Sequence, residues 1–153
     1  MEIEPDELKT RLEKGERLLG LDLGSKTIGL ALSDVMLTVA TPMETIKRKK
    51  FSRDVERIFT IIDEQNVGAL VLGLPKNMDG SEGPRCQSTR QFAKNIMEIR
   101  AIDICFWDER LSTMAVTRTL IEADASRKRQ GELVDKMAAS YILQGLLDKL
   151  SRA

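Results

Sequence analysis

Acidic residues mark three separated segments of this sequence. Asp22 lies among leucines in RLLGLDLGSKTIG, Asp108 and Glu109 close the apolar run IDICFWDE, and Asp135 stands near the start of the last amphipathic segment. Carboxylates that gather in one place repel one another unless a cation neutralises them, and their hard oxygens suit Mg²⁺ or Mn²⁺. Such ions can activate water and stabilise the leaving oxygen of a phosphodiester. The acids therefore predict metal-assisted phosphodiester hydrolysis.

The composition favours the same chemistry by exclusion. The 153 residues include no histidine, which removes the commonest general base and histidine-dependent nucleophiles. Cys86 and Cys105 have no metal-ligand spacing, and the acidic first segment is unlike a secretory signal, so we expect a reducing cytoplasm. No apolar run is long enough for a membrane span. Basic and acidic residues both total 24, so nucleic-acid contacts would have to come from local patches.

Each acid also has a structural explanation that the residue pattern leaves open. Asp22 could cap the turn at Gly24, because aspartate often bonds to the backbone of a turn. Asp135 could simply stabilise a helix dipole. Glu109 could pair with Arg110 or Lys26, and spacing alone does not separate it from Asp108 as the second ligand.

The hydrophobic pattern predicts a sheet that could bring these acids together. Alternating or continuous apolar runs predict five strands, at residues 18–23, 27–33, 39–46, 67–75 and 102–109. Hairpins join the first three strands, whereas helices precede the last two, which should therefore run parallel to the first. The prediction is an α/β fold with a mixed five-stranded sheet, three antiparallel strands then two parallel, flanked by helices. Pro42 suggests that the third strand is an edge or carries a bulge.

Helical spacing predicts the flanking elements. We expect helices at residues 5–13, after an N-cap at Ser52, at 84–99, from Ser112 or Thr113, and at 132–150, with a basic loop at 125–131 before the last. Residues 1–16 would then be an N-terminal extension with a short helix, and residues 17–153 the main domain.

Four ordered motifs resemble the YqgF/RuvX family of Holliday-junction-resolvase-like proteins. They are GLDLGSKTIGLALSD, VLGLPKNMDGSEG, DERLST and VDKMAASYILQ, and they span about residues 18–150. The resemblance implies a ribonuclease H-like fold, a divalent-metal nuclease, a cytoplasmic bacterial setting and a role in maturing the 5′ end of pre-16S ribosomal RNA. Carried over by motif, the catalytic and metal-binding residues would be Asp22, Glu109 and Asp135, which favours Glu109 over Asp108.

Other residues of these motifs are candidates for substrate contacts. Arg110, Asn77 and Lys26 could contact nucleic acid, although plain turn chemistry explains Asn77 slightly better. The basic runs at residues 47–50 and 127–129 could contact the phosphate backbone. The expected partner is pre-rRNA or branched DNA, with ribosome-assembly partners also conceivable. The sequence does not decide between monomer and homodimer, between RNA and DNA, or between Mg²⁺ and Mn²⁺.

Two other classes of protein compete with the nuclease. DLGSKTIG also resembles the first phosphate loop of actin-like ATPases, but those proteins need two such domains and this chain supplies one. A noncatalytic nucleic-acid-binding module is the second alternative, because a fold does not guarantee its chemistry. The presence of all three acids favours the enzyme.

Overall fold

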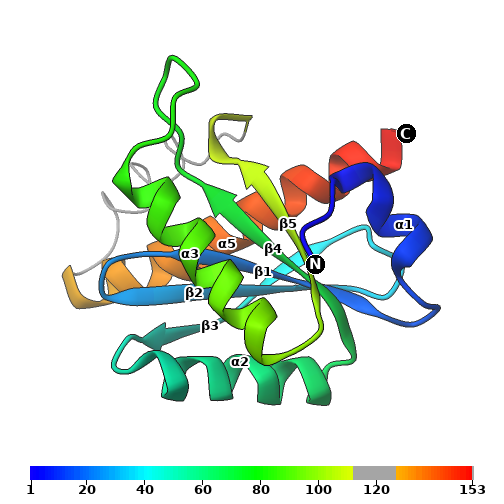
Figure 1. The fold of residues 1–153 in the computed structure, drawn as a ribbon, viewed down its shortest axis with the longest axis horizontal. Coiled ribbons are helices and arrows are strands. Elements are labelled where there is room, and N and C mark those ends of the chain that lie inside the picture. Colours follow the sequence, from blue (N-terminus) through cyan, green and yellow to red (C-terminus); the bar gives the residue numbers. More distant parts are fainter. Residues whose placement is uncertain (112–126, 153) are drawn as a thin grey trace.

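A computed structural model of the chain describes residues 1–111 and 127–152, with side chains described up to Arg110 and from Met137 onward (Figure 1). Its centre is one five-stranded sheet in the order β3-β2-β1-β4-β5. The strands are β1 (Arg17–Leu23), β2 (Thr27–Ser33), β3 (Ala40–Lys47), β4 (Val67–Leu74) and β5 (Asp103–Asp108).

The pairing of the strands confirms the predicted mixed sheet. β2 is antiparallel to both β1 and β3, whereas β4 is parallel to β1 and β5 is parallel to β4. The β1–β2 hairpin accounts for the first arrangement, and helical crossovers account for the second. β1 is thus the central strand. β3 is an edge strand, and its register shifts where Pro42 faces Ala31, as the proline predicts.

Helices cover both faces of the sheet (Figure 1). α2 (Phe51–Glu64) and α3 (Pro84–Ile99) pack on one face against leucines such as Leu19 and Leu21, forming one apolar core. α5 (Arg127–Arg152) covers the opposite face and packs there on Leu18 and Val71. Burying an apolar side chain of this size contributes about 1.5–3 kcal/mol, so these two cores fix the sheet between its helices.

The N-terminal segment packs on the α5 face rather than standing apart from the fold. It forms η1 (Pro5–Glu7) and α1 (Leu8–Arg11), a shorter helical segment than the predicted one at residues 5–13. Leu8 is fully buried among residues of α5, and the N–H of Ile3 donates to the carbonyl of Ile104 in β5. This segment therefore contributes to the core and lines the outer side of β5.

Two predicted helix starts differ from the structure, and one predicted helix lies outside the described residues. α5 begins at Arg127, so residues 127–129 are helical and not part of a basic loop; a single Gly131 did not end the helix. α2 begins at Phe51 with Lys50 in the N-cap position, so the prediction of Ser52 as the cap was wrong. The helix predicted from Ser112 or Thr113 lies outside the described residues, and η2 (Glu109–Leu111) follows β5 directly.

Within the described part of the chain, no helix is both long and apolar enough to cross a membrane.

Candidate functional site

Asp22 is a buried carboxylate near the end of the central strand. Its exposed fraction is 3%, and it pairs with Gly29 of β2 in the sheet. Side chains alternate along a strand, and Leu21 belongs to the core under α2 and α3. Asp22 therefore faces the other side of the sheet, the side that α5 covers.

Glu109 reaches the same side of the sheet through a gap that a glycine leaves. Leu21 pairs with Leu72, so Asp22 and Gly73 are the next residues of two neighbouring strands. A Cβ atom on residue 73 would lie 2.5 Å from Glu109 Oε1 and equally close to Ile142 of α5. Only a residue without a side chain leaves room there, so Gly73 allows the Glu109 side chain to lie over β4, beside the strand that carries Asp22.

Asp108 points to the opposite face of the sheet, although it is adjacent to Glu109 in sequence. It lines a small cavity together with Phe106 and Arg90, and Phe106 packs against the core under α2 and α3. Its carboxylate accepts a hydrogen bond from Arg110 Nη2 at 2.7 Å, and this bond lowers the pKa of Asp108. Asp108 and Glu109 therefore lie on opposite faces of the sheet, a difference that spacing alone could not reveal.

Asp135 lies in α5, but its side chain is outside the described residues. The helix itself approaches the sheet closely just C-terminal to it. A Cβ atom on Gly20 would lie 2.9 Å from Leu143 Cβ and 3.1 Å from the carbonyl oxygen of Ala139. Asp135 precedes Ala139 by four positions, or one helical turn. Among the described residues, no three histidine, cysteine or acidic side chains are grouped as a metal site.

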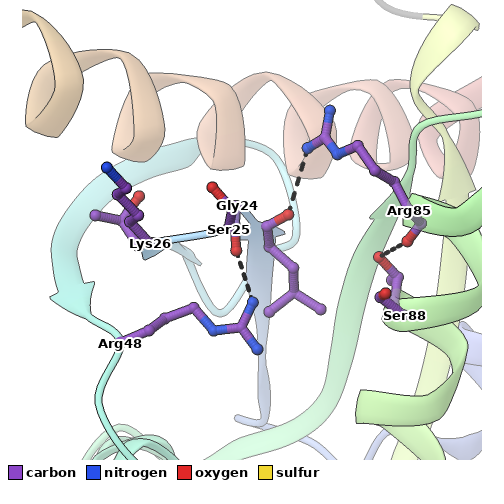
Figure 2. Close-up of a pocket in the computed structure, with 9 residues that line it drawn as sticks. Gly24, Ser25, Lys26, Arg48, Arg85 and Ser88 are labelled. Carbon is purple, nitrogen blue, oxygen red and sulfur yellow. Dashed lines mark hydrogen bonds between the residues drawn. The ribbon is translucent and has the colours of Figure 1, made fainter.

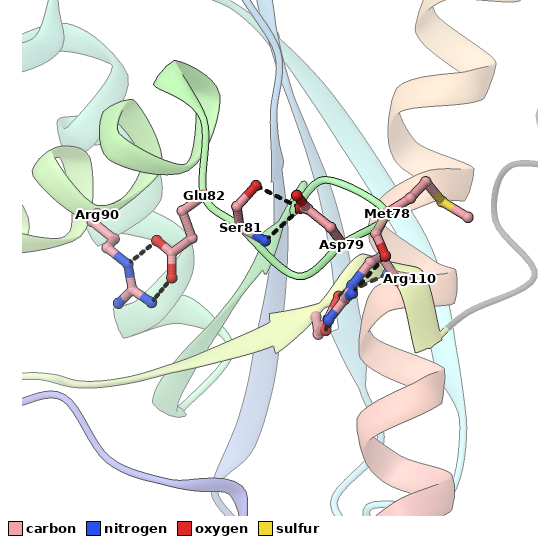
Figure 3. A network of polar contacts seen from close by, with 7 residues as sticks. Met78, Asp79, Ser81, Glu82, Arg90 and Arg110 are labelled. Carbon is pink, nitrogen blue, oxygen red and sulfur yellow. Dashed lines mark hydrogen bonds and ion pairs between the residues drawn. The ribbon is translucent and has the colours of Figure 1, made fainter.

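Arg110 and Asn77 both form hydrogen bonds to the loop that follows β4, and Figure 3 shows Arg110 beside Met78 of this loop. Arg110 Nη1 donates to the carbonyl of Met78 while the same guanidinium pairs with Asp108. The Asn77 side-chain amide donates to the hydroxyl of Ser81, and the Asn77 N–H donates to the Ser81 carbonyl. Turn chemistry thus accounts for the contacts of Asn77, and Arg110 links the loop to the end of β5.

Lys26 lies at the tip of the β1–β2 hairpin, between Leu23 at the end of β1 and Thr27 at the start of β2. It is exposed and lines a pocket with Arg48 and Arg85 (Figure 2). Arg48 and Arg85 were not singled out individually by sequence analysis, although Arg48 belongs to the basic run at residues 47–50. The sequence feature that could have identified them is the positive charge of two arginines on segments that the topology brings to the same hairpin.

The two cysteines offer no reactive thiolate. Cys86 and Cys105 are buried and unpaired with each other. Burial raises the pKa of both thiols, that of Cys105 to about 12. Because the thiolate is the nucleophilic form, carboxylates are the more plausible chemical groups at neutral pH.

Comparison with known proteins agrees with the fold and the motifs. The model of the RuvX family, described as Holliday junction resolvase, matches residues 16–149. A protein of Paramagnetospirillum magneticum named "Putative pre-16S rRNA nuclease" is 65% identical over 147 residues, covering 96% of this chain and 95% of the relative. A protein of Methylocella silvestris with the same name is 54% identical over 150 residues, covering 98% and 93%.

Solved structures with low sequence identity share the fold. Thermus thermophilus RuvC, in complex with a Holliday junction substrate, has a TM-score of 0.57 at 13% identity, covering 90% of this chain and 98% of that one. The yeast mitochondrial Holliday junction resolvase Ydc2 has a TM-score of 0.53 at 10% identity, covering 95% and 83%. The family model and the close relatives both extend over nearly the whole sequence, and the chain belongs to the RuvX family.

Proposed function

We propose that this protein is a divalent-metal-dependent nuclease that processes the 5′ end of pre-16S ribosomal RNA. The observation that carries the proposal is the placement of Asp22 and Glu109 on one face of the sheet. Asp22 is buried on β1, and Glu109 lies over Gly73 of the adjacent strand. The names of the close relatives support the choice of RNA.

In this proposal Asp22, Glu109 and Asp135 are the metal ligands and catalytic residues. Carboxylate oxygens are the ligands that Mg²⁺ and Mn²⁺ prefer. Asp22 and Glu109 would supply two carboxylates, and Asp135 of α5 would supply the third. Asp135 is assigned by its motif and by its place one turn before Ala139, which packs against Gly20. Bound there, the metal would supply activation of water and stabilisation of the leaving oxygen.

The remaining assignments concern substrate and setting. Lys26 would attract the phosphate backbone, and Arg110 and Asn77 would position the loop after β4 beside the strand being cut. We further propose a cytoplasmic setting, with pre-rRNA as the main partner and ribosome-assembly factors as additional ones. A single site suffices to trim a precursor, whereas symmetric cleavage of a four-way junction would call for a homodimer.

The test compares cleavage by the parent and by Asp22→Asn, with Mg²⁺ or Mn²⁺. Substrates are a structured RNA that carries the 5′ precursor sequence and a four-way DNA junction. Asp22→Asn should cut the RNA more than about 100-fold more slowly, because even the loss of residues that only orient metal ligands costs 10–100-fold. Asp54→Asn is the matched control, since Asp54 is also a buried aspartate, 4% exposed, but on α2.

Three results would contradict the proposal in different ways. Equal cleavage by Asp22→Asn and the parent would remove Asp22 from the site. Cleavage of the junction alone would reassign the substrate to branched DNA. Binding of RNA without any cleavage by the parent would favour the noncatalytic module.

A further inference from the structure

A basic pocket lies between the β1–β2 hairpin and the start of α3 (Figure 2). Its volume is about 560 Å³. The residues that line it come from the hairpin, from the segment after β3 and from the first turns of α3: Leu23, Gly24, Ser25, Lys26, Thr27, Arg48, Arg85, Ser88 and Thr89. Three of these side chains are cationic, several carry hydroxyl groups, and none is acidic.

Ion pairing distinguishes the cations of this basic pocket from several other arginines in the part of the chain that the structure describes. Five other arginines of the described chain pair with carboxylates: Arg11, Arg57, Arg90, Arg100 and Arg110. Among the residues that the structure describes, Lys26, Arg48 and Arg85 form no ion pair. Three uncompensated positive charges around one pocket attract an anion, since charges of one sign in a cleft focus the local field.

Arg48 is held in place by contacts that leave most of its donors available. Its Nη1 donates to the carbonyl of Gly24 at 2.6 Å, and its guanidinium lies 5.8 Å from the ring centroid of Phe92. The backbone N–H of Arg48 donates to the carbonyl of Lys26 at 2.8 Å. A guanidinium has five N–H groups, so one side-chain bond to the hairpin leaves others for a ligand.

Arg85 approaches the same hairpin from α3. Its Nη2 lies 3.5 Å from the carbonyl oxygen of Leu23, a long contact that holds the side chain weakly. Arg48 and Arg85 thus contact the carbonyls of two consecutive residues, Leu23 and Gly24, from opposite sides. The exposed Ser25 and Ser88 add hydroxyl groups that can donate to phosphate oxygens.

We infer that the basic pocket binds a backbone phosphate of the nucleic-acid strand whose neighbouring phosphodiester lies at Asp22. This inference rests on the proposed function. Leu23, which lines the pocket, directly follows Asp22, and the two side chains point to opposite sides of β1. A nucleic-acid strand that passes over the end of β1 would therefore contact the acids on one side of the sheet and the three cations on the other.

The ligand is a phosphodiester backbone rather than a base or a free nucleotide. None of the described residues that line the pocket is aromatic, so the pocket has no aromatic ring on which a base could stack. Contacts of ammonium, guanidinium and hydroxyl groups with phosphate oxygens carry no sequence information. The contacts should therefore position the strand without selecting its sequence.

The test measures RNA binding as a function of salt for Lys26→Gln and Arg85→Gln. Both residues are exposed, so these variants should fold as the parent does. Arg48 is not used, because its bond to Gly24 also supports the hairpin. The control is Lys94→Gln, which removes one positive charge from an exposed position further along α3. Binding of a labelled single-stranded RNA is followed in EDTA, so that no cleavage occurs.

Each pocket variant should lower the slope of log K against log[salt] by about 1, and by the same amount for two unrelated RNA sequences. Lys94→Gln should keep the slope of the parent. Parent-like slopes for both pocket variants would overturn the inference, as would a loss that depends on sequence. Stabilisation of the parent by inorganic phosphate or a mononucleotide, together with an unchanged RNA slope, would reassign the pocket to a free anion.

Failure of this inference is distinguishable from failure of the proposed function. If the parent cleaves RNA and Asp22→Asn does not, but the pocket variants bind with the parent's slope, the pocket and the role of Lys26 in substrate binding are lost while the metal-dependent nuclease stands. If the parent binds neither RNA nor branched DNA in EDTA, both are lost.

Discussion

The Glu109 carboxylate lies over Gly73, with its Oε1 atom 2.5 Å from the position that a Cβ atom on residue 73 would take. The missing side chain of Gly73 thus leaves a space on β4, next to the strand that carries Asp22, and the side chain of Glu109 fills this space. This packing predicts that a single methyl group on β4 would move an acid of the candidate site.

Gly73→Ala should therefore reduce cleavage more than it reduces stability. The ends of the Glu109 and Ile142 side chains can rotate away from the new methyl group, so the free energy of unfolding should fall by only about 1 kcal/mol, at the low end for overpacked cores. Metal-dependent cleavage per folded molecule should fall by more than about 10-fold. Denaturant unfolding and a cleavage assay on the same samples measure the two effects.

Gly68→Ala is the matched control for this change. Gly68 lies near the start of the same strand, where a Cβ atom would crowd Glu16 and Leu12 at 2.6 Å. It should cost similar stability and leave cleavage per folded molecule unchanged. Equal activity of the two alanine variants would show that the position of Glu109 does not matter for the reaction.

Metal binding should be visible as stabilisation without any substrate. A ligand present at 100 times its dissociation constant stabilises the folded state by about 2.7 kcal/mol if it binds that state alone. We expect Mn²⁺ to raise the melting temperature of the parent and of Asp54→Asn, with a smaller rise for Asp22→Asn and Glu109→Gln. A rise of the same size in all four proteins would place the metal elsewhere.

Asp34 should make stability depend on acid pH. Its carboxylate accepts hydrogen bonds from the Thr38 hydroxyl and from the N–H groups of Thr38 and Val39. These bonds, chiefly the one from the Thr38 hydroxyl, lower the pKa of Asp34 to about 2. The folded pKa is below the unfolded value of about 3.9, so the stabilisation is complete above pH 4 or so and disappears as the pH falls through about 2.

Asp34→Ala measures this contribution. At neutral pH the variant should unfold about 1 kcal/mol more easily, a figure reduced for the partial exposure of the carboxylate. The difference from the parent should shrink as the pH falls towards 2. Gln87→Ala, at an exposed position of α3, should show no such dependence, because it removes no titratable group. A gap between Asp34→Ala and the parent that stays constant with pH would contradict the assignment.

Arg110 and Asp108 should act as a coupled pair. The side chain of Arg110 is 33% exposed and that of Asp108 17%, so solvent screens their attraction and the coupling should be small but non-zero. A double-mutant cycle with Arg110→Gln and Asp108→Asn measures it through urea unfolding. Additive effects would mean that the ion pair does not hold the loop after β4, and a direct role of Arg110 on the substrate would then gain support.

Much of the fold follows from hydrophobic period alone, but the candidate site does not. Leu19 and Leu21 alternate with Gly20 and Asp22, and this pattern predicts β1, while the turn at residues 24–26 and the alternating run after it predict its antiparallel pairing with β2. Spacing could not say which of Asp108 and Glu109 lies on the face of Asp22, because Glu109 follows the end of β5 and its side chain lies over Gly73 of the neighbouring strand. Register depends on contacts between distant segments, which no local pattern reports.

Errors at helix ends have a similar origin. The predicted start of α5 at residue 132 followed a predicted basic loop at residues 125–131, yet the helix extends back to Arg127 and includes Gly131. A glycine within a helix costs only about 1 kcal/mol, which neighbouring turns can offset. The sequence also did not predict that Lys26, Arg48 and Arg85 line one pocket, since the three residues meet only when α3 packs beside the hairpin.

The proline in β3 has a consequence for how copies of this molecule meet. An exposed edge strand can template pairing with another chain, which leads to aggregation. Pro42 has no N–H to offer such a neighbour, and the shifted register opposite Ala31 bends the edge locally. Replacing this one residue by a β-branched amino acid would therefore restore an N–H donor to the edge and favour self-association of the protein through β3.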